Sequence, residues 1–477
     1  MASSGGGGGG DVSLRPLPAF RPELYQRAWA SIPHPTLPLL ATCHSKAVTV
    51  YSLSTLSSHS TLTGGHARSV RSAAWKPAQP PHKLCLATGS FDSTAALWRW
   101  DGDNVPFTSS PAGANPVQQQ QKNTGDNLEV EITAASIPTN GNNNNNHNDD
   151  DGASDKEEDW EFSLVLEGHE SEVKSVAFSP SAQYLATCSR DKTVWIWEDV
   201  GADEADDEWE TVAVLNEHEA DVKCVAWCPD VPGRTARGKY GAEVLASSSY
   251  DNTVRVWRED GDGEWVCVAV LEGHDGTVWG VQWESDTART KFPRLMSFSA
   301  DKTIRIWTMR EDDDEEEGGD GRNPLFRPGL GGIPNTMRQS VREEWDCTVV
   351  LPAVHTRDVY SAAWSVNTGL IASTGSDGII AIYKEDGDSK AATNGPGGAE
   401  SAAGGEGAAP SAAPSDSPGP GRWRVLSTLK NAHGPYEINH ITWCRRFDPD
   451  AVDRGIEEML VTTGDNGVVK PWQVITS

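Results

Sequence analysis

The sequence predicts an all-β fold: a single domain that forms a seven-bladed β-propeller, closed into a ring by an N-terminal strand in the last blade. The first observation is a segment that recurs six times, with a His near its start and an Asp or Asn six residues before a Trp or Tyr. The second is the alternation of side chains along strands, as in VKSVAF. The third is length, because seven repeats of about 40–45 residues occupy roughly 300 residues. The copies are anchored at His66, His169, His218, His274, His355 and His433.

We name the four strands of each blade a to d from the centre outward, and the blades 1 to 7 in chain order. Blade 1 lacks the His and extends from Arg27 to Tyr51. A Trp opens the outer strand nine or ten residues before five of the six His residues. Segments such as WEFSLVLEGH and WVCVAVLEGH therefore represent one repeated element. Strand c of blades 2 to 7 ends at Trp98, Trp197, Trp257, Trp307, Tyr383 and Trp472.

The last blade lacks a fourth strand of its own, since only five residues follow Trp472. Residues 11–17 (DVSLRPL) can supply it. Pro16 is acceptable in this outer strand because an edge strand need not donate every backbone N–H. The N-terminal segment is therefore predicted to close the ring.

Insertions are predicted to interrupt the propeller on one face only. Residues 1–10 are expected to be a disordered Gly-rich tail, and residues 11–477 to form the propeller. The long acidic or low-complexity insertions at 101–159, 309–344 and 385–421 are expected to be disordered. All long insertions follow strand c or separate strands a and b. The face made by the His-containing and Asp-containing turns keeps short loops, and we expect specific binding there.

The net charge of −29 disfavours nucleic acid as a direct partner, since phosphate binding needs clustered Lys and Arg. No apolar stretch of about 18 residues is present, so no membrane partner is expected. The start, MASSGGGGGG, lacks the apolar core of a secretory signal. The eight Cys residues are therefore expected as thiols in a reducing compartment, the cytosol with the nucleus as a second location.

Four copies contain a complete His–Ser–Asp–Trp set that resembles a hydrolase triad. A Ser-His-Asp enzyme needs one accessible set beside an oxyanion hole, so four copies indicate a structural role. We expect the Asp to accept a hydrogen bond from the His, the His to bond the Ser, and the Ser to bond the Trp indole. These structural tetrads are His66, Ser90, Asp92 and Trp98; His169, Ser189, Asp191 and Trp197; His218, Ser249, Asp251 and Trp257; and His274, Ser299, Asp301 and Trp307.

The sequence predicts no catalytic residue, no cofactor and no metal site. It contains no P-loop, dinucleotide fingerprint or nucleophile elbow. Cys224 and Cys228 lie four residues apart on a predicted strand. At about 3.3 Å per residue they would be about 13 Å apart, too far to share a metal with bonds of about 2.3 Å.

Cationic and aromatic residues recur at two repeat positions on the face with short loops. One position is the second residue of strand a, and the other precedes the turn Asp. On an acidic chain, this rim suits a peptide that offers carboxylates and an aromatic side chain. The alternative is that these are ordinary rim residues whose stems pack on their neighbours. The predicted partner-binding residues are Arg71, Lys174, Arg190, Lys223, Tyr250, Trp279 and Tyr360; the same positions elsewhere hold Phe91, Ala300, Ser376, Asn439 and Asp465.

The segment LEGHESEVKSVAFSPSAQYLATCSRDKTVWIWE resembles a WD-repeat family, the propeller subunit of the cytosolic iron–sulfur protein assembly (CIA) targeting machinery. VLNEHEADVKCVAWCP and ASSSYDNTVRVWRED are similar to the same family. The resemblance covers all seven blades and fails only in the insertions.

The resemblance implies a non-catalytic scaffold or adaptor that helps a targeting complex recognise apo iron–sulfur client proteins. It implies MIP18-type and MMS19-type partner subunits, contact with an iron-only-hydrogenase-like assembly protein, and a partner-binding role for Arg190 in CSRDK. Two other interpretations stay open. One is a substrate receptor of a cullin-type ubiquitin ligase, although the Trp-Asp-x-Arg typical of that class is missing after strand c. The other is a peptide-reading WD-repeat adaptor.

Overall fold

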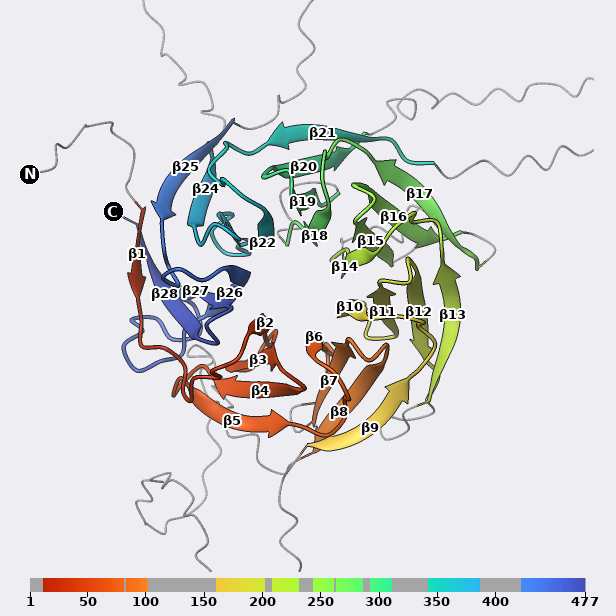
Figure 1. Ribbon diagram of the computed structural model, residues 1–477, viewed down its shortest axis with the longest axis horizontal. Coiled ribbons are helices and arrows are strands. Elements are labelled where there is room, and N and C mark those ends of the chain that lie inside the picture. Colours follow the sequence, from red (N-terminus) through yellow and green to blue (C-terminus); the bar gives the residue numbers. More distant parts are fainter. Residues whose placement is uncertain are drawn as a thin grey trace, which may run out of the picture.

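The computed structural model describes residues 12–80, 83–101, 160–201, 208–230, 243–260, 263–285, 292–310, 342–386 and 422–476. In these residues, 28 strands form seven four-stranded antiparallel sheets that radiate from a central axis (Figure 1). The predicted all-β, seven-bladed propeller is confirmed. The described part of the chain contains no apolar helix of membrane-spanning length.

The first four blades are each made of four consecutive strands. Blade 1 contains β2 (Ala28–Pro33), β3 (Leu39–His44), β4 (Ala47–Ser52) and β5 (Ser57–Leu62). Blade 2 contains β6 (Val70–Trp75), β7 (Lys83–Ser90), β8 (Ala95–Asp101) and β9 (Glu161–Leu166). Blade 3 contains β10 (Val173–Phe178), β11 (Tyr184–Ser189), β12 (Val194–Asp199) and β13 (Trp209–Leu215). Blade 4 contains β14 (Val222–Trp227), β15 (Val244–Ser249), β16 (Val254–Glu259) and β17 (Trp265–Leu271).

The last blade combines the two ends of the chain. Blade 5 contains β18 (Val278–Trp283), β19 (Leu295–Ser299), β20 (Ile304–Met309) and β21 (Trp345–Val350). Blade 6 contains β22 (Val359–Trp364), β23 (Ile371–Gly375), β24 (Ile380–Asp386) and β25 (Arg422–Leu429). Blade 7 contains β26 (Ile438–Arg445), β27 (Glu458–Gly464), β28 (Val469–Thr476) and β1 (Val12–Pro16). β1 pairs antiparallel with β28, from Val12 opposite Thr476 to Pro16 opposite Trp472, which is the predicted ring closure.

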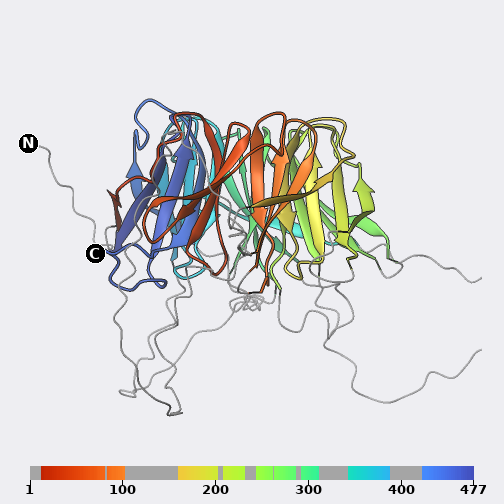
Figure 2. The ribbon, with the colours of Figure 1, turned by 90° about the horizontal axis from the view of Figure 1, so that it is seen from below.

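The turns divide the disc into two faces (Figure 2). The turns from d to a and from b to c form the His–Asp face, and the turns from a to b and from c to d form the opposite face. Every internal segment outside the described residues joins a to b or c to d, so it attaches at the opposite face. Strands β8, β20 and β24 run through Asp101, Met309 and Asp386, into the ends of the three predicted insertions. Residues 102–159, 311–341 and 387–421 of those insertions, and the tail at 1–10, lie outside the described residues.

In blades 2 to 6, the Trp at the start of the outer strand packs on the aromatic residue that ends strand a of the same blade. Such offset or edge-to-face pairs contribute about 0.5–1.5 kcal/mol beyond their area burial. This contact explains why the Trp recurs at a fixed distance from the His. The five pairs, with their ring-centroid distances, are Trp75–Trp160 (6.0 Å), Phe178–Trp209 (6.0 Å), Trp227–Trp265 (5.6 Å), Trp283–Trp345 (5.8 Å) and Trp364–Trp423 (5.8 Å).

Neighbouring blades are joined by hydrogen bonds between their a strands. The indole of the Trp that ends strand a donates to a carbonyl of the preceding blade, as Trp75 Nε1 does to Ile32 O at 3.0 Å. Trp227, Trp283 and Trp443 repeat this bond. Nearer the His–Asp face, the Ser72 and Ser361 hydroxyls accept from Val176 N–H and Ile441 N–H of the next blade. The inner ring is therefore held by specific bonds as well as by apolar packing.

Candidate protein-docking site

The His and Asp of all four predicted tetrads meet as expected. His169 Nδ1 lies 2.8 Å from Asp191 Oδ2, and the same pair in blade 2, His66 and Asp92, lies at 3.2 Å. Asp191 also accepts from the Glu170 and Thr193 backbone N–H groups, so it fixes two turns at once. Burial would raise the pKa of Asp191, but hydrogen bonds from His169 and Thr193 outweigh it and hold the pKa below its usual range.

The predicted hydroxyl of the tetrads is wrong. His169 Nε2 and Trp197 Nε1 both contact Thr187 Oγ1, at 2.8 and 3.0 Å, and not the predicted Ser189. The same correction applies to Ser90, Ser249 and Ser299. We call the hydroxyl that contacts both the His and the Trp the relay hydroxyl; in blades 2, 4 and 5 it belongs to Thr88, Ser247 and Ser297.

The cross-strand register explains the correction. Trp197 pairs with Leu185, so Thr187 is the near diagonal neighbour of its indole. Ser189 is four residues beyond Leu185, about 13 Å along the strand, and lies out of reach. It instead accepts from Asp191 N–H and donates to Ser171 O, which fixes the turn between strands b and c.

Blades 6 and 7 keep the relay although their tetrads are incomplete. His355 joins Asp377 and Ser373, and His433 joins Asn466 and Thr462. The relay hydroxyl is thus present in all six copies, whereas the predicted Ser position is Gly375 or Gly464 in the last two. That pattern was readable in the sequence and identifies the relay residue.

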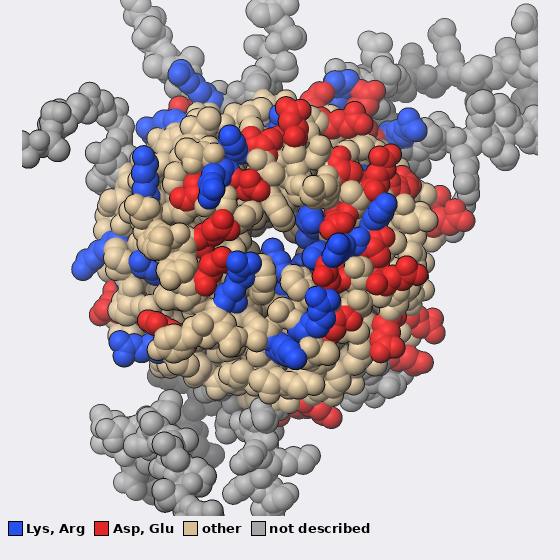
Figure 3. All heavy atoms as spheres, viewed as in Figure 1, with Lys and Arg blue, Asp and Glu red and all other residues tan. Residues whose placement is uncertain are grey.

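The predicted partner-binding residues all lie towards the His–Asp face. On this face, Lys and Arg side chains surround the central opening (Figure 3). Arg71, Lys174, Lys223, Trp279 and Tyr360 are each the second residue of strand a in blades 2 to 6. Arg190 and Tyr250 lie in the turns between strands b and c of blades 3 and 4. The expected gathering on one rim is therefore observed, while a binding role for it stays a prediction.

Two carboxylates neutralise much of this rim. Lys174 Nζ lies 3.0 Å from Glu172, and Lys223 Nζ lies 3.2 Å from Asp221. Arg190 contacts both acids, at 3.4 and 3.9 Å, and so links blades 3 and 4. Glu172 and Asp221 were not predicted from the sequence, although each stands two residues before its Lys and therefore lies on the same side of the strand.

Aromatic rings of the rim are also covered by its own cations. Lys174 Nζ lies 4.3 Å from the centroid of the Phe91 ring. Lys223 Nζ lies between Tyr250 and Trp279, at 5.3 and 5.5 Å. Such contacts contribute about 0.5–1 kcal/mol each at exposed sites. These lysines are structural members of the rim as much as candidate ligand contacts.

The side chains that remain accessible define a smaller docking patch of Arg68, Arg190 and Tyr250. Arg68 and Arg190 are 59% and 58% exposed, whereas the Lys174 and Lys223 side chains are 17% and 13% exposed. Tyr250 is 59% exposed. Two guanidinium groups beside an exposed phenol can bind a carboxylate bidentately and pack on an apolar or aromatic side chain.

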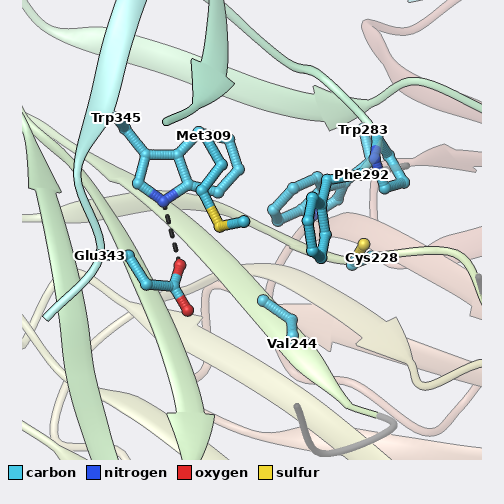
Figure 4. Close-up of a pocket in the computed structure, with 8 residues that line it drawn as sticks. Cys228, Val244, Trp283, Phe292, Met309, Glu343 and Trp345 are labelled. Carbon is cyan, nitrogen blue, oxygen red and sulfur yellow. Dashed lines mark hydrogen bonds between the residues drawn. The ribbon is translucent and has the colours of Figure 1, made fainter. Parts of the chain in front are cut away.

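Small pockets on the opposite face do not assemble a metal site. Cys228 lines an apolar pocket of about 20 Å³ with Trp283, Met309 and Trp345, beside the Glu343 carboxylate that accepts from the Trp345 indole (Figure 4). Cys224 contacts the Val281 carbonyl in the inner ring instead. Among the described residues, no group of three His, Cys, Asp or Glu side chains is placed to hold a metal ion. All eight cysteines are free thiols.

Comparison with known proteins finds matches along nearly the whole chain. The family described as "WD domain, G-beta repeat" matches residues 160–198, 209–258, 265–308 and 345–384. A Pyricularia oryzae protein named "Probable cytosolic iron-sulfur protein assembly protein 1" is 59% identical over 466 residues, which cover 97% of each chain. Proteins of the same name from Neurospora crassa and Aspergillus niger are 55% and 42% identical. They cover 97% and 94% of this chain, and 96% and 93% of their own lengths.

Proposed function

Because this chain belongs to the family of cytosolic iron-sulfur protein assembly protein 1, a family of WD-repeat propellers, we propose that it is a non-catalytic scaffold of the cytosolic iron–sulfur protein assembly machinery. In this role it helps a targeting complex recognise apo-proteins that receive iron–sulfur clusters. The cluster is cargo of the machinery, and no residue of this chain is assigned to carry it. The working location is the cytosol, with the nucleus as a second location.

The observation that carries this proposal is the docking patch on an uninterrupted face. Each turn of the His–Asp face lies within the described residues, and no insertion attaches there. Arg68 and Arg190 both approach Glu172, yet their side chains stay more than half exposed. A partner carboxylate can therefore compete for guanidinium groups that are already positioned, which reduces the entropy lost on binding.

The proposed companions are a MIP18-type subunit, an MMS19-type subunit, an iron-only-hydrogenase-like assembly protein and apo iron–sulfur clients. A non-catalytic role is supported by the relay sets, whose hydroxyls and imidazoles are buried inside six different blades. A buried hydroxyl cannot reach a substrate carbonyl. The His and hydroxyl side chains therefore stabilise the blades, and a partner would be recognised by surface residues.

The test is purification of the full chain, tagged at its C-terminus, from native extract, with mass spectrometry of stoichiometric companions. A MIP18-like protein and a large helical-repeat protein are expected. Arg190→Glu should deplete at least one of them several-fold without changing the melting temperature. Lys302→Glu is the matched control, since it makes the same charge change in a turn of the same face in blade 5. A cullin adaptor or chromatin proteins as the main companions would refute the proposal.

A further inference from the structure

A second surface lies on the outer wall of blades 2, 3 and 4, where the outer strands β9, β13 and β17 run towards the His–Asp face (Figure 1). Each of these strands leads into a turn with exposed carboxylates beside the His that opens the next blade. We call these turns and strands together the acid–valine wall. Its six carboxylates are Glu167, Glu170, Glu217, Glu219, Glu272 and Asp275.

The carboxylates of the wall are confined to three consecutive turns. In the turns at His66, His355 and His433, no acid lies within two residues before the His or one residue after it. Acidic side chains gather along the same side of the disc, on the right in Figure 3, whereas the other sides carry mixed charge. The charge is therefore a property of one sector and not of the repeat.

These acids are not used to hold the fold. Among the described residues, only Glu217 of the six forms an ion pair, with Arg255 at 3.0 Å. Several uncompensated carboxylates in one sector repel each other, which works against the folded state. Their field also extends about 8 Å into solvent at physiological ionic strength, which favours the approach of a basic partner.

The strands below the acids expose large apolar side chains. Val212 and Val214 of β13 are 41% and 47% exposed, Val270 of β17 is 45% exposed, and Phe162 of β9 is 40% exposed. Val214 and Val270 occupy the same repeat position, just before the buried Leu that ends each strand. Exposed apolar side chains that are bordered by charged groups are typical of interaction surfaces.

The backbone of the wall is also open to a partner. In the described chain β13 pairs only with β12, so its other edge keeps free N–H and C=O groups. On the neighbouring β17, one backbone carbonyl already accepts from outside its sheet, because Glu343 N–H, just before β21, donates to Val268 O at 2.8 Å. An added strand would place alternate side chains towards the valines and towards solvent or the acids.

We propose that the acid–valine wall docks an extended segment of a partner protein in which Lys or Arg alternates with aliphatic side chains. The aliphatic side chains pack on Val214 and Val270, and the cations meet Glu217, Glu219 and Glu272. The choice of a basic occupant follows from the charge of this sector. The inference adds a surface to the proposed function but does not rest on it, since it uses none of the docking-patch residues.

The test is fluorescence anisotropy with the full chain and a labelled ten-residue peptide of alternating Lys and Val. Glu217→Gln/Glu219→Gln/Glu272→Gln and, separately, Val214→Ser/Val270→Ser are each expected to weaken binding at least tenfold. Rising salt should weaken binding as well. A peptide with Glu in place of Lys should not bind, and neither should one with Ser in place of Val.

Matched controls separate docking from general charge attraction. Val350→Ser changes an equally exposed valine, 50% exposed, of the blade 5 outer strand. Glu23→Gln/Asp450→Asn/Asp453→Asn removes the same charge from exposed acids of another sector. Both controls, and Arg190→Glu, should leave affinity within twofold.

Each contrary outcome overturns the proposal. Unchanged affinity in the valine variant would mean adventitious charge attraction only. An equal loss in the control variants would mean that the sector has no special role, and absence of binding would remove the docking surface altogether. A failure here leaves the companions expected from purification unaffected, so the two proposals fail separately.

Discussion

Blades 2 to 7 each contain a buried hydroxyl that contacts both the repeat His and the aromatic residue that ends the repeat. Thr187 Oγ1 accepts from the Trp197 indole while it meets His169 Nε2, and it is fully buried. A buried donor without an acceptor costs about 1–3 kcal/mol. Single atoms of this kind therefore decide how firmly strands a, b and c of a blade are joined.

Thr187→Val is expected to reduce the free energy of unfolding by about 2 kcal/mol, since it keeps the shape and removes the acceptor. Urea unfolding measures this loss. The indole N–H resonance of Trp197 should shift and exchange faster in Thr187→Val but not in Ser189→Ala. A shift in the serine variant alone would restore Ser189 to the relay.

The turn carboxylates make stability depend on pH. Burial raises the pKa of Asp191, Asp251 and Asp301, but hydrogen bonds from His and Thr outweigh it, so each folded-state pKa is depressed. A depressed pKa contributes stability above the unfolded-state pKa of about 3.9, and this contribution is lost as pH falls towards the folded-state value.

Asp191→Asn is therefore expected to lower stability at pH 7 and to make its decline below about pH 5 shallower. Asn466 shows that an amide can occupy this position, since it accepts from His433 at 3.0 Å. Urea unfolding at a series of pH values measures the slope. The exposed Asp450→Asn is the control, and an identical acid slope in the two variants would contradict the assignment.

For single residues, the sequence predicted where a side chain lies better than which side chain it contacts. The His and Asp roles followed from the repeat because both residues lie in short turns that the repeat fixes. The role of the hydroxyl did not follow from the repeat. Which hydroxyl faces the His depends on the cross-strand register, and the spacing of residues along the chain does not give that register. The lysines of the rim were located correctly, but their ion pairs with Glu172 and Asp221 were not predicted, although side chains at i and i+2 of a strand share one face.

A largely buried cluster of ion pairs links blade 5 to blade 6. Arg294 donates to both oxygens of Glu284 in its own blade and to both oxygens of Glu385 in blade 6, at 2.8–3.0 Å. Glu284 is nearly inaccessible. Removal of the cation would leave a buried carboxylate with no charge partner in this cluster.

Arg294→Met is accordingly expected to destabilise the protein by about 3–5 kcal/mol, the range for breaking one side of a buried ion pair. Arg310→Ala, which removes an exposed guanidinium at the edge of blade 5, should leave stability nearly unchanged, because solvent screens exposed ion pairs. Chemical unfolding of both variants makes the comparison. Equal effects would show that the Arg294 cluster is not a junction between blades 5 and 6.

The closing strand gives a prediction for one element. Deletion of residues 1–10 leaves β1 intact, whereas deletion of residues 1–20 removes β1 and the buried Phe20. Only the longer deletion should lower the melting temperature, by several degrees or more, because it opens an edge of blade 7. Equal melting temperatures for the two truncations would show that β1 does not stabilise the ring.

Elements were predictable because their signals are local and repeated. Alternation located the strands, and the missing fourth strand of blade 7 predicted β1. The contacts between a strands could not be predicted, because which carbonyl an indole reaches depends on how neighbouring blades are inclined. The same limit applied to Arg294, whose two acids lie 10 and 91 residues away along the chain.

At the scale of the whole molecule, the described ends of a long insertion can lie side by side at the edge of the disc. Asp386 of β24 pairs directly with Arg422 of β25, so the two ends of the blade 6 insertion already lie opposite each other. Lengthening a loop between fixed ends costs little, about 0.6 kcal/mol per doubling. Replacement of residues 391–417 by a short Gly-Ser linker is therefore expected to keep the melting temperature within about 2 °C. A fall of more than about 5 °C in differential scanning calorimetry would show that the insertion packs on the disc.

The pairing of β1 with β28 also determines when the ring can close during translation. Of the described strands, β1 is made first and its partner β28 last, since they occupy residues 12–16 and 469–476. At roughly 5–20 residues per second, the ribosome needs about half a minute to a minute and a half between the two. During that interval six blades can form in order while the ring stays open. The edges of β1 and of the incomplete blade 7 therefore stay unpaired until β28 has been made, and open strand edges of this kind can pair wrongly in a nascent chain.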